Sequence, residues 1–249
     1  MKTVNRYVTG LSCVWEHAKK RQEVKGDNPF KGQRSRVTGK NSKPYRALTD
    51  DELTKLFSLT PKRRDLWEIP LVGLYTGMRL NEICSLQWGN VRREDGIWYF
   101  DITAAKSEAG VRVVPVHSRL SWLPERRSED PRELVWPEME PGGPDAKHSW
   151  QFSKRFTAHR RRAGIESDDR WRTAFHSLRK NVTRCIERAR VPQTEWAEIV
   201  GHEKAGITYR VYNPDGLTMA QRSEIVELIR YPGLEESGVV RTWEAERLA

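Results

Sequence analysis

Six side chains of the types that bind phosphate and move protons are spread over more than half of the chain. They are Arg79, Lys106, His176, Arg179, His202 and Tyr212. An arginine offers phosphate a flat, permanently charged fork, an imidazole titrates near neutral pH, and a tyrosine phenol can act as a nucleophile. Two arginines, two histidines, a lysine and a tyrosine are the groups needed to cut a phosphodiester without a metal ion. The set predicts DNA strand exchange through a tyrosine nucleophile.

The two arginines are expected to hold one phosphate. Arg79 stands in the phrase TGMRLNEICSL and Arg179 in FHSLRK. Two guanidinium forks can stabilise the charge that gathers on the phosphate oxygens in a pentacoordinate transition state. Glu82, one helical turn after Arg79, can orient that guanidinium, or the two can form an ordinary surface pair. A surface salt bridge is the more common role for an arginine outside such a phrase.

The histidines and Lys106 can transfer protons. His176 lies three residues before Arg179 on one helical face, so one phosphate can meet both. His202 follows Gly201 just after a predicted helix, where the backbone is open to close approach. Lys106 lies at a predicted hairpin tip, ITAAKSEAGVRVV, where it is either a general acid or a common turn lysine. A structural role is expected for His117, His148 and His159.

The composition restricts the class of protein. The chain has 249 residues, no stretch of the ~20 apolar residues that a membrane helix needs, and no secretory signal at its start. Its cysteines, Cys13, Cys84 and Cys185, are far apart and form no CxxC pair. This pattern argues against a disulfide framework or a zinc site and fits a reducing cytoplasm. No carboxylate or histidine spacing typical of a metal nuclease is visible.

Positive charge is concentrated at the start of the chain. The formal net charge is +10, from 44 Lys and Arg against 34 Asp and Glu. Residues 1–46 hold 12 Lys and Arg against 3 Asp and Glu, a net of +9, which leaves +1 for residues 47–249. The first segment is therefore either bound to a polyanion such as DNA or simply a solvated helix and tail. Any anion site in the remainder must be local.

A mostly helical fold must position these residues. Thr49 and Glu52 predict a capping box, and residues 64–77 predict a largely buried helix that ends at a glycine. Two β-rich runs, 98–103 and 111–116, flank the polar KSEAG and predict an antiparallel hairpin. Further helices are predicted over residues 3–24, 48–57, 79–88, 149–164, 176–190, 194–200 and 218–231, with a polar tail after them.

Residues 3–24 predict an amphipathic helix with an apolar stripe that needs a partner. That partner is either the remainder of this chain or a domain outside it. The following segment, 26–46, is rich in Gly, Pro, Asn and Ser and carries six basic residues, so it predicts a flexible basic linker.

The phrases, taken in order, resemble the tyrosine recombinase family, the phage-type integrases. The matching residues are Gly77, Arg79 and Glu82, then Lys106, then His176, Leu178 and Arg179, then Gly201 and His202, and last Tyr212. The resemblance covers residues 47–230. It implies an α+β fold, mainly α-helical with a small antiparallel β-sheet, of the DNA breaking and rejoining kind. It also implies that Lys106 is the general acid and that Glu82 orients Arg79.

Two tyrosines compete for the role of nucleophile. Tyr212 lies ten residues after His202 and Tyr209 seven, whereas the family's usual spacing is nine. One extra residue in the EKAG loop explains the longer distance, so we favour Tyr212 and expect Tyr209 to be a packing residue. A phenol with a pKa of ~10 needs the field of the arginines and a nearby base. Attack would leave a 3′-phosphotyrosyl bond and a free 5′ hydroxyl, and the retained bond energy permits rejoining without ATP or metal.

The resemblance also predicts the domain organisation. Residues 1–25 resemble the last helix of the family's core-binding domain, 26–46 its linker, 47–230 the catalytic domain and 231–249 a C-terminal tail. The earlier helices of the core-binding domain are absent from this sequence. The chain is thus either a fragment of a longer enzyme or a shortened relative, and the unsatisfied stripe on the first helix favours the fragment.

The implied function is site-specific DNA recombination by an integrase that uses no metal, ATP or other cofactor. The implied partners are double-stranded DNA at attachment or crossover sites and further copies of the chain, as a tetramer on DNA. The C-terminal helix, 218–231, would dock on a neighbouring protomer or, alternatively, on its own. The expected location is the cytoplasm of a bacterium, associated with the nucleoid, with no membrane contact. A non-catalytic DNA-binding protein derived from an integrase and a type IB topoisomerase are the other candidates.

Overall fold

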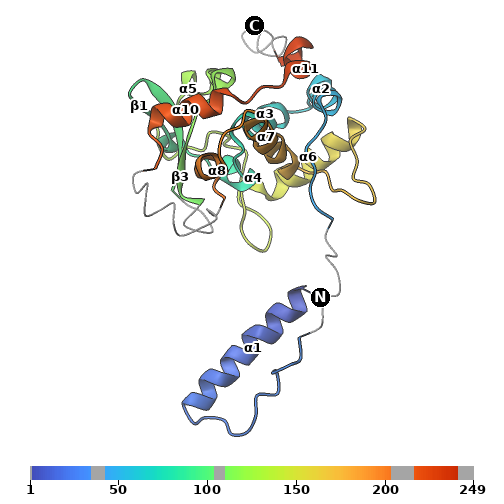
Figure 1. Ribbon diagram of the computed structural model, residues 1–249, viewed down its shortest axis with the longest axis vertical. Helices are drawn as coiled ribbons and strands as arrows, with labels where there is room; N and C mark the ends of the chain where they lie inside the picture. The colour runs from blue at the N-terminus through green and yellow to red at the C-terminus, as the bar shows by residue number, and fades with distance from the viewer. Residues whose placement is uncertain (1, 35–42, 104–109, 203–215, 241–249) are drawn as a thin grey trace. The chain divides into compact units, whose positions relative to one another are not determined.

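The computed structural model describes residues 2–34, 43–103, 110–202 and 216–240. The chain divides into two compact units, Met1–Lys43 and Pro44–Ala249. Helix α1 (Lys2–Lys20) belongs to the first unit, and every other helix and strand described below belongs to the second (Figure 1).

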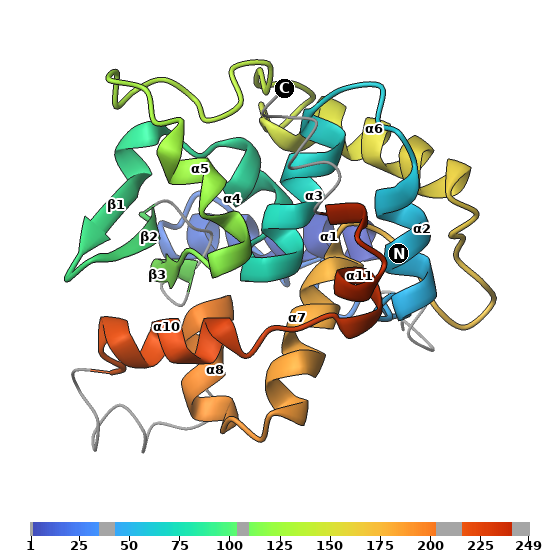
Figure 2. The same cartoon turned by 90° about the horizontal axis from the view of Figure 1, so that it is seen from above.

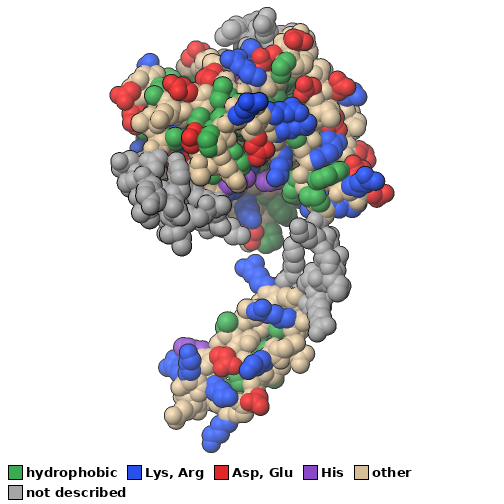
Figure 3. Space-filling view, viewed as in Figure 1, with side chains coloured by type: hydrophobic (Ala, Val, Ile, Leu, Met, Phe, Trp, Pro, Cys, Tyr) green, Lys and Arg blue, Asp and Glu red, His purple; other side chains and the backbone are tan. Residues whose placement is uncertain are grey.

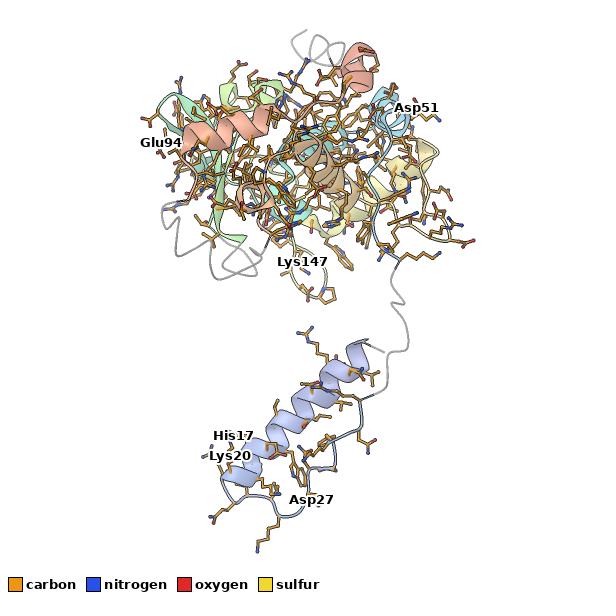
Figure 4. All side chains as sticks on the ribbon, viewed as in Figure 1. His17, Lys20, Asp27, Asp51, Glu94 and Lys147 are labelled. Atoms are coloured by element: carbon orange, nitrogen blue, oxygen red, sulfur yellow. The ribbon has the colours of Figure 1, made fainter. Side chains whose placement is uncertain are left out.

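The smaller unit consists of α1 and a loop that folds back along it. The amide of Asn28 donates to the Ser12 carbonyl at 3.2 Å, to the Ser12 hydroxyl at 2.9 Å and to Glu16 at 2.9 Å. The rings of Trp15 and Phe30 meet edge to face, with centroids 6.5 Å apart. The first part of the predicted linker, residues 26–34, thus lies along α1, to which one buried amide and one aromatic pair attach it. Figure 4 shows Asp27 in this loop, below the end of α1 that carries His17 and Lys20.

The apolar stripe predicted for α1 is only partly covered by this loop. Val4, Leu11 and Val14 remain exposed, whereas Trp15 is partly buried against the loop. The loop thus buries only one side of the apolar stripe. A single extended segment is too narrow to cover a whole helical face.

The larger unit is built around α3 (Asp65–Thr76), in which every residue is buried. The helix before it, α2 (Asp50–Ser58), begins with the predicted capping box, in which Thr49 accepts from the backbone of Glu52 and Glu52 accepts from the backbone of Thr49. Helix α7 (His176–Arg188) packs on α3 at close range, since a Cβ on Gly73 would lie 2.6 Å from the ring of Phe175. The two helices lie side by side at the centre of the unit (Figure 1, Figure 2).

Two acidic side chains are buried in α3, and each is paired. Glu68 accepts two hydrogen bonds from Arg126, both at 2.8 Å, and one from the indole of Trp136 at 2.8 Å. Asp65 accepts from Arg155 at 2.9 Å. A buried carboxylate is tolerated only when its lost hydration is replaced in this way, so α3 is held to its neighbours by charge as well as by apolar packing.

A three-stranded antiparallel sheet lies at one side of the larger unit, opposite α2 and α6 (Figure 2). Its order is β1 (Val91–Glu94), β2 (Ile97–Ile102), β3 (Arg112–Pro115), with Phe100 paired to both Val91 and Val114. The predicted β2–β3 hairpin is confirmed. Strand β1 was not predicted, because only its first residue is buried and VRRE carries no apolar alternation.

The other elements complete a mainly helical unit, as predicted. They are α4 (Leu80–Cys84), η1 (Trp88–Asn90), η3 (Ser118–Leu120), α5 (Trp122–Glu125), α6 (Ser149–Arg162), α8 (Gln193–Val200), α10 (Met219–Glu227) and α11 (Pro232–Glu236). In Figure 4, Asp51 marks α2, Glu94 the end of β1 and Lys147 the loop before α6. None of the helices in the described ranges is long and apolar enough to cross a membrane.

The C-terminal part differs from the expected helix and polar tail. Helix α10 ends at Glu227, and the chain then turns so that Ile229 and Tyr231 are buried. The Tyr231 hydroxyl donates to the Leu74 carbonyl at 2.9 Å, and Leu234 of α11 is fully buried. These apolar residues are spaced too irregularly for one continuous helix to bury them all, so two short helices with a turn between them do so.

Candidate active site

The turn after α3 sets the position of Arg79. Gly77 ends the helix with φ of 66°, in the left-handed region, and Arg79 then has extended backbone just before α4. A Cβ on Gly77 would lie 3.1 Å from Val182 of α7 and 3.2 Å from Val200 of α8. Only glycine gives this turn both its conformation and its room, so α3, α7 and α8 meet beside Arg79.

Glu82 binds Arg79 twice. The Arg79 guanidinium donates from Nη1 to Oε1 at 2.7 Å, and its backbone N–H donates to Oε2 at 2.8 Å. The Glu82 side chain is only 8% exposed, so this is not an ordinary surface pair. These two hydrogen bonds fix the backbone and the guanidinium of Arg79 relative to Glu82, while 42% of the Arg79 side chain stays accessible to solvent.

Arg179 is brought to Arg79 by a shared backbone acceptor. Arg179, on the buried side of α7, donates from Nη1 to the Gly77 carbonyl at 2.6 Å. Its Nη2 lies 3.4 Å from the Gly201 carbonyl, to which Nη2 of Arg79 donates at 2.8 Å. Gly201 ends α8 with φ of 68°, which turns this carbonyl between the two guanidinium groups. Two arginines a hundred positions apart in sequence therefore lie side by side.

Both candidate histidines lie next to this arginine pair. His176 is the first residue of α7, and its ring lies 5.0 Å from that of Tyr45. His202 directly follows Gly201, and its ring meets Trp196 edge to face at 5.5 Å. On the face shown in Figure 3, histidine side chains lie beside Lys and Arg side chains of the larger unit.

Burial and positive charge keep both imidazoles neutral. Partial burial, followed by the charges of Arg179, Lys180 and Arg79, lowers the pKa of His176 to about 4. The same causes, with His176 itself added, lower the pKa of His202 to about 4. Burial and the charges of Arg79 and Arg112 lower the pKa of Arg179 to about 9, so its guanidinium is still cationic at neutral pH. The site is poised for an anion, which would relieve this repulsion.

Lys106, Tyr209 and Tyr212 lie outside the described residues. Their roles, and the choice between the two tyrosines, therefore stay predictions from the sequence.

Arg112, which the sequence reasoning missed, is bound to Glu82 from the other side. Its Nη2 donates to Oε2 of Glu82 at 2.9 Å and its Nη1 to Oε1 at 3.2 Å, and its side chain is 3% exposed. Arg112 shares a strand face with the buried Val114, while Val111 is exposed. An arginine on the apolar face of a predicted strand was the available signal, because such a charge needs a buried partner.

Tyr45 was also missed, because it falls in the predicted linker. Residues 44–46 run beside Arg172: the Arg172 N–H donates to the Pro44 carbonyl at 2.8 Å, and the Arg46 N–H to the Arg172 carbonyl at 3.2 Å. The Arg172 guanidinium lies over the Tyr45 ring at 4.8 Å. The end of the predicted linker is thus attached to the loop before α7, and its aromatic ring packs on His176.

The other histidines have the contacts of structural residues. His117 is fully buried and bonds to the Ile229 carbonyl at 3.0 Å, and His159 is buried with the Leu56 carbonyl at 3.3 Å. His148 bonds to the Met139 carbonyl. Within the described ranges, no three His, Cys, Asp or Glu side chains gather closely enough to hold a metal ion.

The sequence of the chain matches the model of one protein family. The family is described as the phage integrase family, and the match spans residues 46–216. All six candidate catalytic residues lie within this range. No protein of curated function matches the chain.

Solved structures share the fold at low sequence identity. The integrase of mycobacterium phage Brujita is 19% identical, with a TM-score of 0.52 over 92% of this chain and 72% of that one. A lambda integrase (75–356) dimer bound to a COC′ core site is 18% identical, with a TM-score of 0.55 over 82% and 75%. The Tn1549 transposon integrase in complex with transposon right end DNA is 18% identical, with a TM-score of 0.56 over 92% and 80%.

These likenesses confirm the fold that the sequence phrases implied, that of a tyrosine recombinase catalytic domain with its small antiparallel sheet. Since the family match covers well over half of the 249 residues, the chain belongs to the phage integrase family.

Proposed function

We propose that this chain is a site-specific DNA recombinase that cuts and rejoins DNA strands through a 3′-phosphotyrosyl bond to Tyr212. The observation that carries the proposal is the pairing of Arg79 and Arg179 at one backbone carbonyl, that of Gly201. Two guanidinium groups this close favour the binding of an anion beyond the single carboxylate of Glu82, and a phosphodiester offers the charge and the acceptor oxygens that such a pair binds.

The arginine pair would bind the non-bridging oxygens of the scissile phosphate. Arg179 is buried and fixed by two carbonyls, whereas Arg79 keeps 42% of its side chain accessible. The fixed fork defines where the phosphate rests, and the accessible fork closes on it. Preorganised donors of this kind stabilise the charge of the pentacoordinate transition state at little reorganisation cost.

The chemical step needs one base and one acid. The Tyr212 oxygen attacks phosphorus and its proton goes to a neutral imidazole, His176 or His202. The bond from phosphorus to the 5′ oxygen breaks, and Lys106 gives that oxygen its proton. A pKa of about 4 leaves both histidines unprotonated at pH 7. A phosphate bound by the arginines would offset the charges that lower this pKa, so the imidazoles would become stronger bases when DNA is bound. Rejoining is the reverse reaction with another 5′ hydroxyl, and it needs no ATP.

The partners follow from charge and from the comparisons. Residues 1–46, with their net charge of +9, would bind the DNA backbone as the end of a core-binding domain and its linker, ahead of a catalytic domain at 47–230 and a tail at 231–249. One similar structure is a lambda integrase tetramer bound to a Holliday junction. We propose a tetramer on DNA for this chain, in a bacterial cytoplasm.

The proposed route of assembly, through the C-terminal helix, has to account for where α10 lies. In the structure α10 packs on β3 and α8 of its own unit, with Ile225 and Val226 buried. Docking on a neighbouring protomer would therefore require α10 to exchange one buried site for an equivalent one.

A nicked suicide substrate tests the proposed chemistry. A nick close to the cleavage site makes the fragment that carries the free 5′ hydroxyl short enough to diffuse away after attack. Rejoining is then prevented, and the covalent protein–DNA adduct accumulates. We expect the wild-type protein and Tyr209→Phe to form the adduct and Tyr212→Phe to form none, because the phenyl ring lacks the attacking oxygen. An adduct that persists in Tyr212→Phe would move the nucleophile to Tyr209. No adduct with the wild type would mean a DNA-binding protein without cutting activity.

A further inference from the structure

Arg112, at the start of β3, has its whole guanidinium engaged by three separate segments. Its Nε donates to the Ile199 carbonyl at 2.7 Å, and its Nη1 donates to the Gly110 carbonyl at 2.8 Å. Nη1 and Nη2 also donate to the two carboxylate oxygens of Glu82, at 3.2 Å and 2.9 Å. Nε, Nη1 and Nη2 of Arg112 all bind acceptors of the protein itself, and only 3% of its side chain is exposed, so this guanidinium is committed to contacts within the protein.

Each of these contacts leads to a member of the candidate site. Glu82 holds the guanidinium and the backbone of Arg79. Ile199 lies two residues before Gly201, whose carbonyl accepts from both phosphate-binding arginines. Gly110 is four residues after Lys106 in sequence. One buried side chain thus joins the helix of Arg79, the end of α8 and the base of the β2–β3 hairpin.

The charge balance at Glu82 requires Arg112. Burial alone would raise the pKa of Glu82, but the hydrogen bonds and charge of Arg112, and after them the bonds from Arg79, outweigh burial and lower it. If the Arg79 guanidinium turned to a phosphate without Arg112 in place, the buried Glu82 carboxylate would keep the Arg79 backbone N–H but lose its cationic partner, which is strongly unfavourable. Arg112 keeps Glu82 paired throughout, so Arg79 is free to share its donors between Glu82 and a ligand.

We propose that Arg112 is a positioning residue for strand cleavage, which holds Glu82 and the end of α8 so that Arg79 and the Gly201 carbonyl keep the geometry that receives the phosphate. This role rests on the proposed function. It separates two tasks within one cluster: Arg79 and Arg179 meet the phosphate, while Arg112 supports them from inside the protein.

Three variants test this role. Arg112→Met removes the guanidinium and keeps the apolar length, and Arg112→Lys keeps a charge that cannot span Glu82 and the Ile199 carbonyl together. Arg126→Met is the matched control, because Arg126 also forks onto a buried carboxylate, Glu68, which makes no contact with Arg79 among those described.

The readout is single-turnover cleavage of nicked duplexes carrying either a normal scissile phosphodiester or a methylphosphonate. A methylphosphonate has a methyl group in place of one charged oxygen. Its rate of cleavage therefore depends less on arginines that stabilise that charge. We expect Arg112→Met to cleave the phosphodiester about 10²- to 10³-fold more slowly than wild type, the cost of a mispositioned charge-stabilising donor. The deficit should shrink to about tenfold or less on the methylphosphonate. Arg112→Lys should be intermediate, with DNA affinity unchanged within about twofold because the contacts of this side chain lie within the protein.

A loss of folded protein lowers the rates on both substrates by the same factor, as we expect for Arg126→Met. Equal deficits for Arg112→Met on the two substrates, or cleavage at the wild-type rate, would overturn the positioning role while the proposed function stands. Failure of the wild type itself to cleave the phosphodiester would overturn the proposed function, and this role with it.

Discussion

His176 and His202 are surrounded by cations that no described acid in contact with them neutralises. Both have a pKa near 4 in the free protein, through burial first and then Arg179, Lys180 and Arg79. The unfolded chain, with histidines near ~6.5, binds more protons than the folded one between about pH 4 and 6.5. The free energy of unfolding is therefore unaffected by the titration of these two rings above pH 6.5, and it decreases as the pH falls from 6.5 toward 4.

Replacement of Lys180 should raise both histidine pKa values. Lys180→Gln removes one positive charge that disfavours the imidazolium forms. We expect the pH titration of the Cε1–H resonances by NMR to shift upward for both rings. Lys55→Gln, which removes an exposed lysine of α2, is the control and should leave the two titrations where they are. Titrations unchanged by Lys180→Gln would show that the charge of Lys180 does not contribute to these pKa values.

Among the elements, the turn between α3 and α4 has the strictest requirement. Gly77 combines a left-handed backbone with contacts near 3.1 Å to α7 and α8, and its carbonyl binds Arg179. Any side chain there must strain the turn and push two helices apart.

Gly77→Ala should therefore destabilise the larger unit and weaken the arginine site together. The left-handed conformation alone costs about 1–2 kcal/mol for alanine, and the contacts with Val182 and Val200 add to this. Gly164→Ala is the matched control, since Gly164 has φ of 73° and nothing within 4 Å of an added Cβ. Urea denaturation should give a larger loss for Gly77→Ala than for Gly164→Ala. Equal losses would mean that the helices move apart without cost.

The sequence predicted those elements whose signal is local. The capping box at Thr49, the glycine end of α3 and the β2–β3 hairpin were all readable from short patterns and are confirmed. Helix α11 and the folded-back loop at Asn28 were missed, because each depends on a tertiary contact rather than on its own periodicity. Strand β1 was missed because VRRE has no apolar alternation, although the Asp95–Gly96 turn that joins it to β2 was a local signal.

The candidate site follows the same rule. Arg79, His176, Arg179 and His202 were found through their phrases and lie together in the structure. Arg112 and Tyr45 were missed, since a residue that supports a site is defined by what it touches across the fold.

At the scale of the molecule, the C-terminal segment is part of the core of the larger unit. If the C-terminal helix docked on a neighbouring protomer, deletion of residues 217–249 would be expected to weaken assembly on paired sites. The structure changes that expectation, because the deletion also removes Val226, Ile229 and Leu234 from the core. At roughly 1.5–3 kcal/mol for each buried side chain, the loss is comparable to the whole stability of a domain, about 5–15 kcal/mol.

We therefore expect the deletion to unfold the larger unit. Circular dichroism should show no cooperative thermal transition for the truncated protein. Leu228→Ser, at a residue that is 45% exposed, should keep the wild-type transition within a few degrees and is the better probe of contacts between protomers. A truncated protein that melts cooperatively would show that the core is complete without its last segment.

The oxygen between Arg79 and Arg179 belongs to the main chain. A backbone carbonyl is present whatever amino acid occupies a position, so no exchange of side chain can remove this acceptor while the path of the chain after α8 is kept. The path of the backbone at Gly201, and not a further side chain, therefore sets the positions of the two guanidinium groups. Sequences can diverge widely around such a centre, as long as a residue that tolerates the left-handed turn remains at position 201.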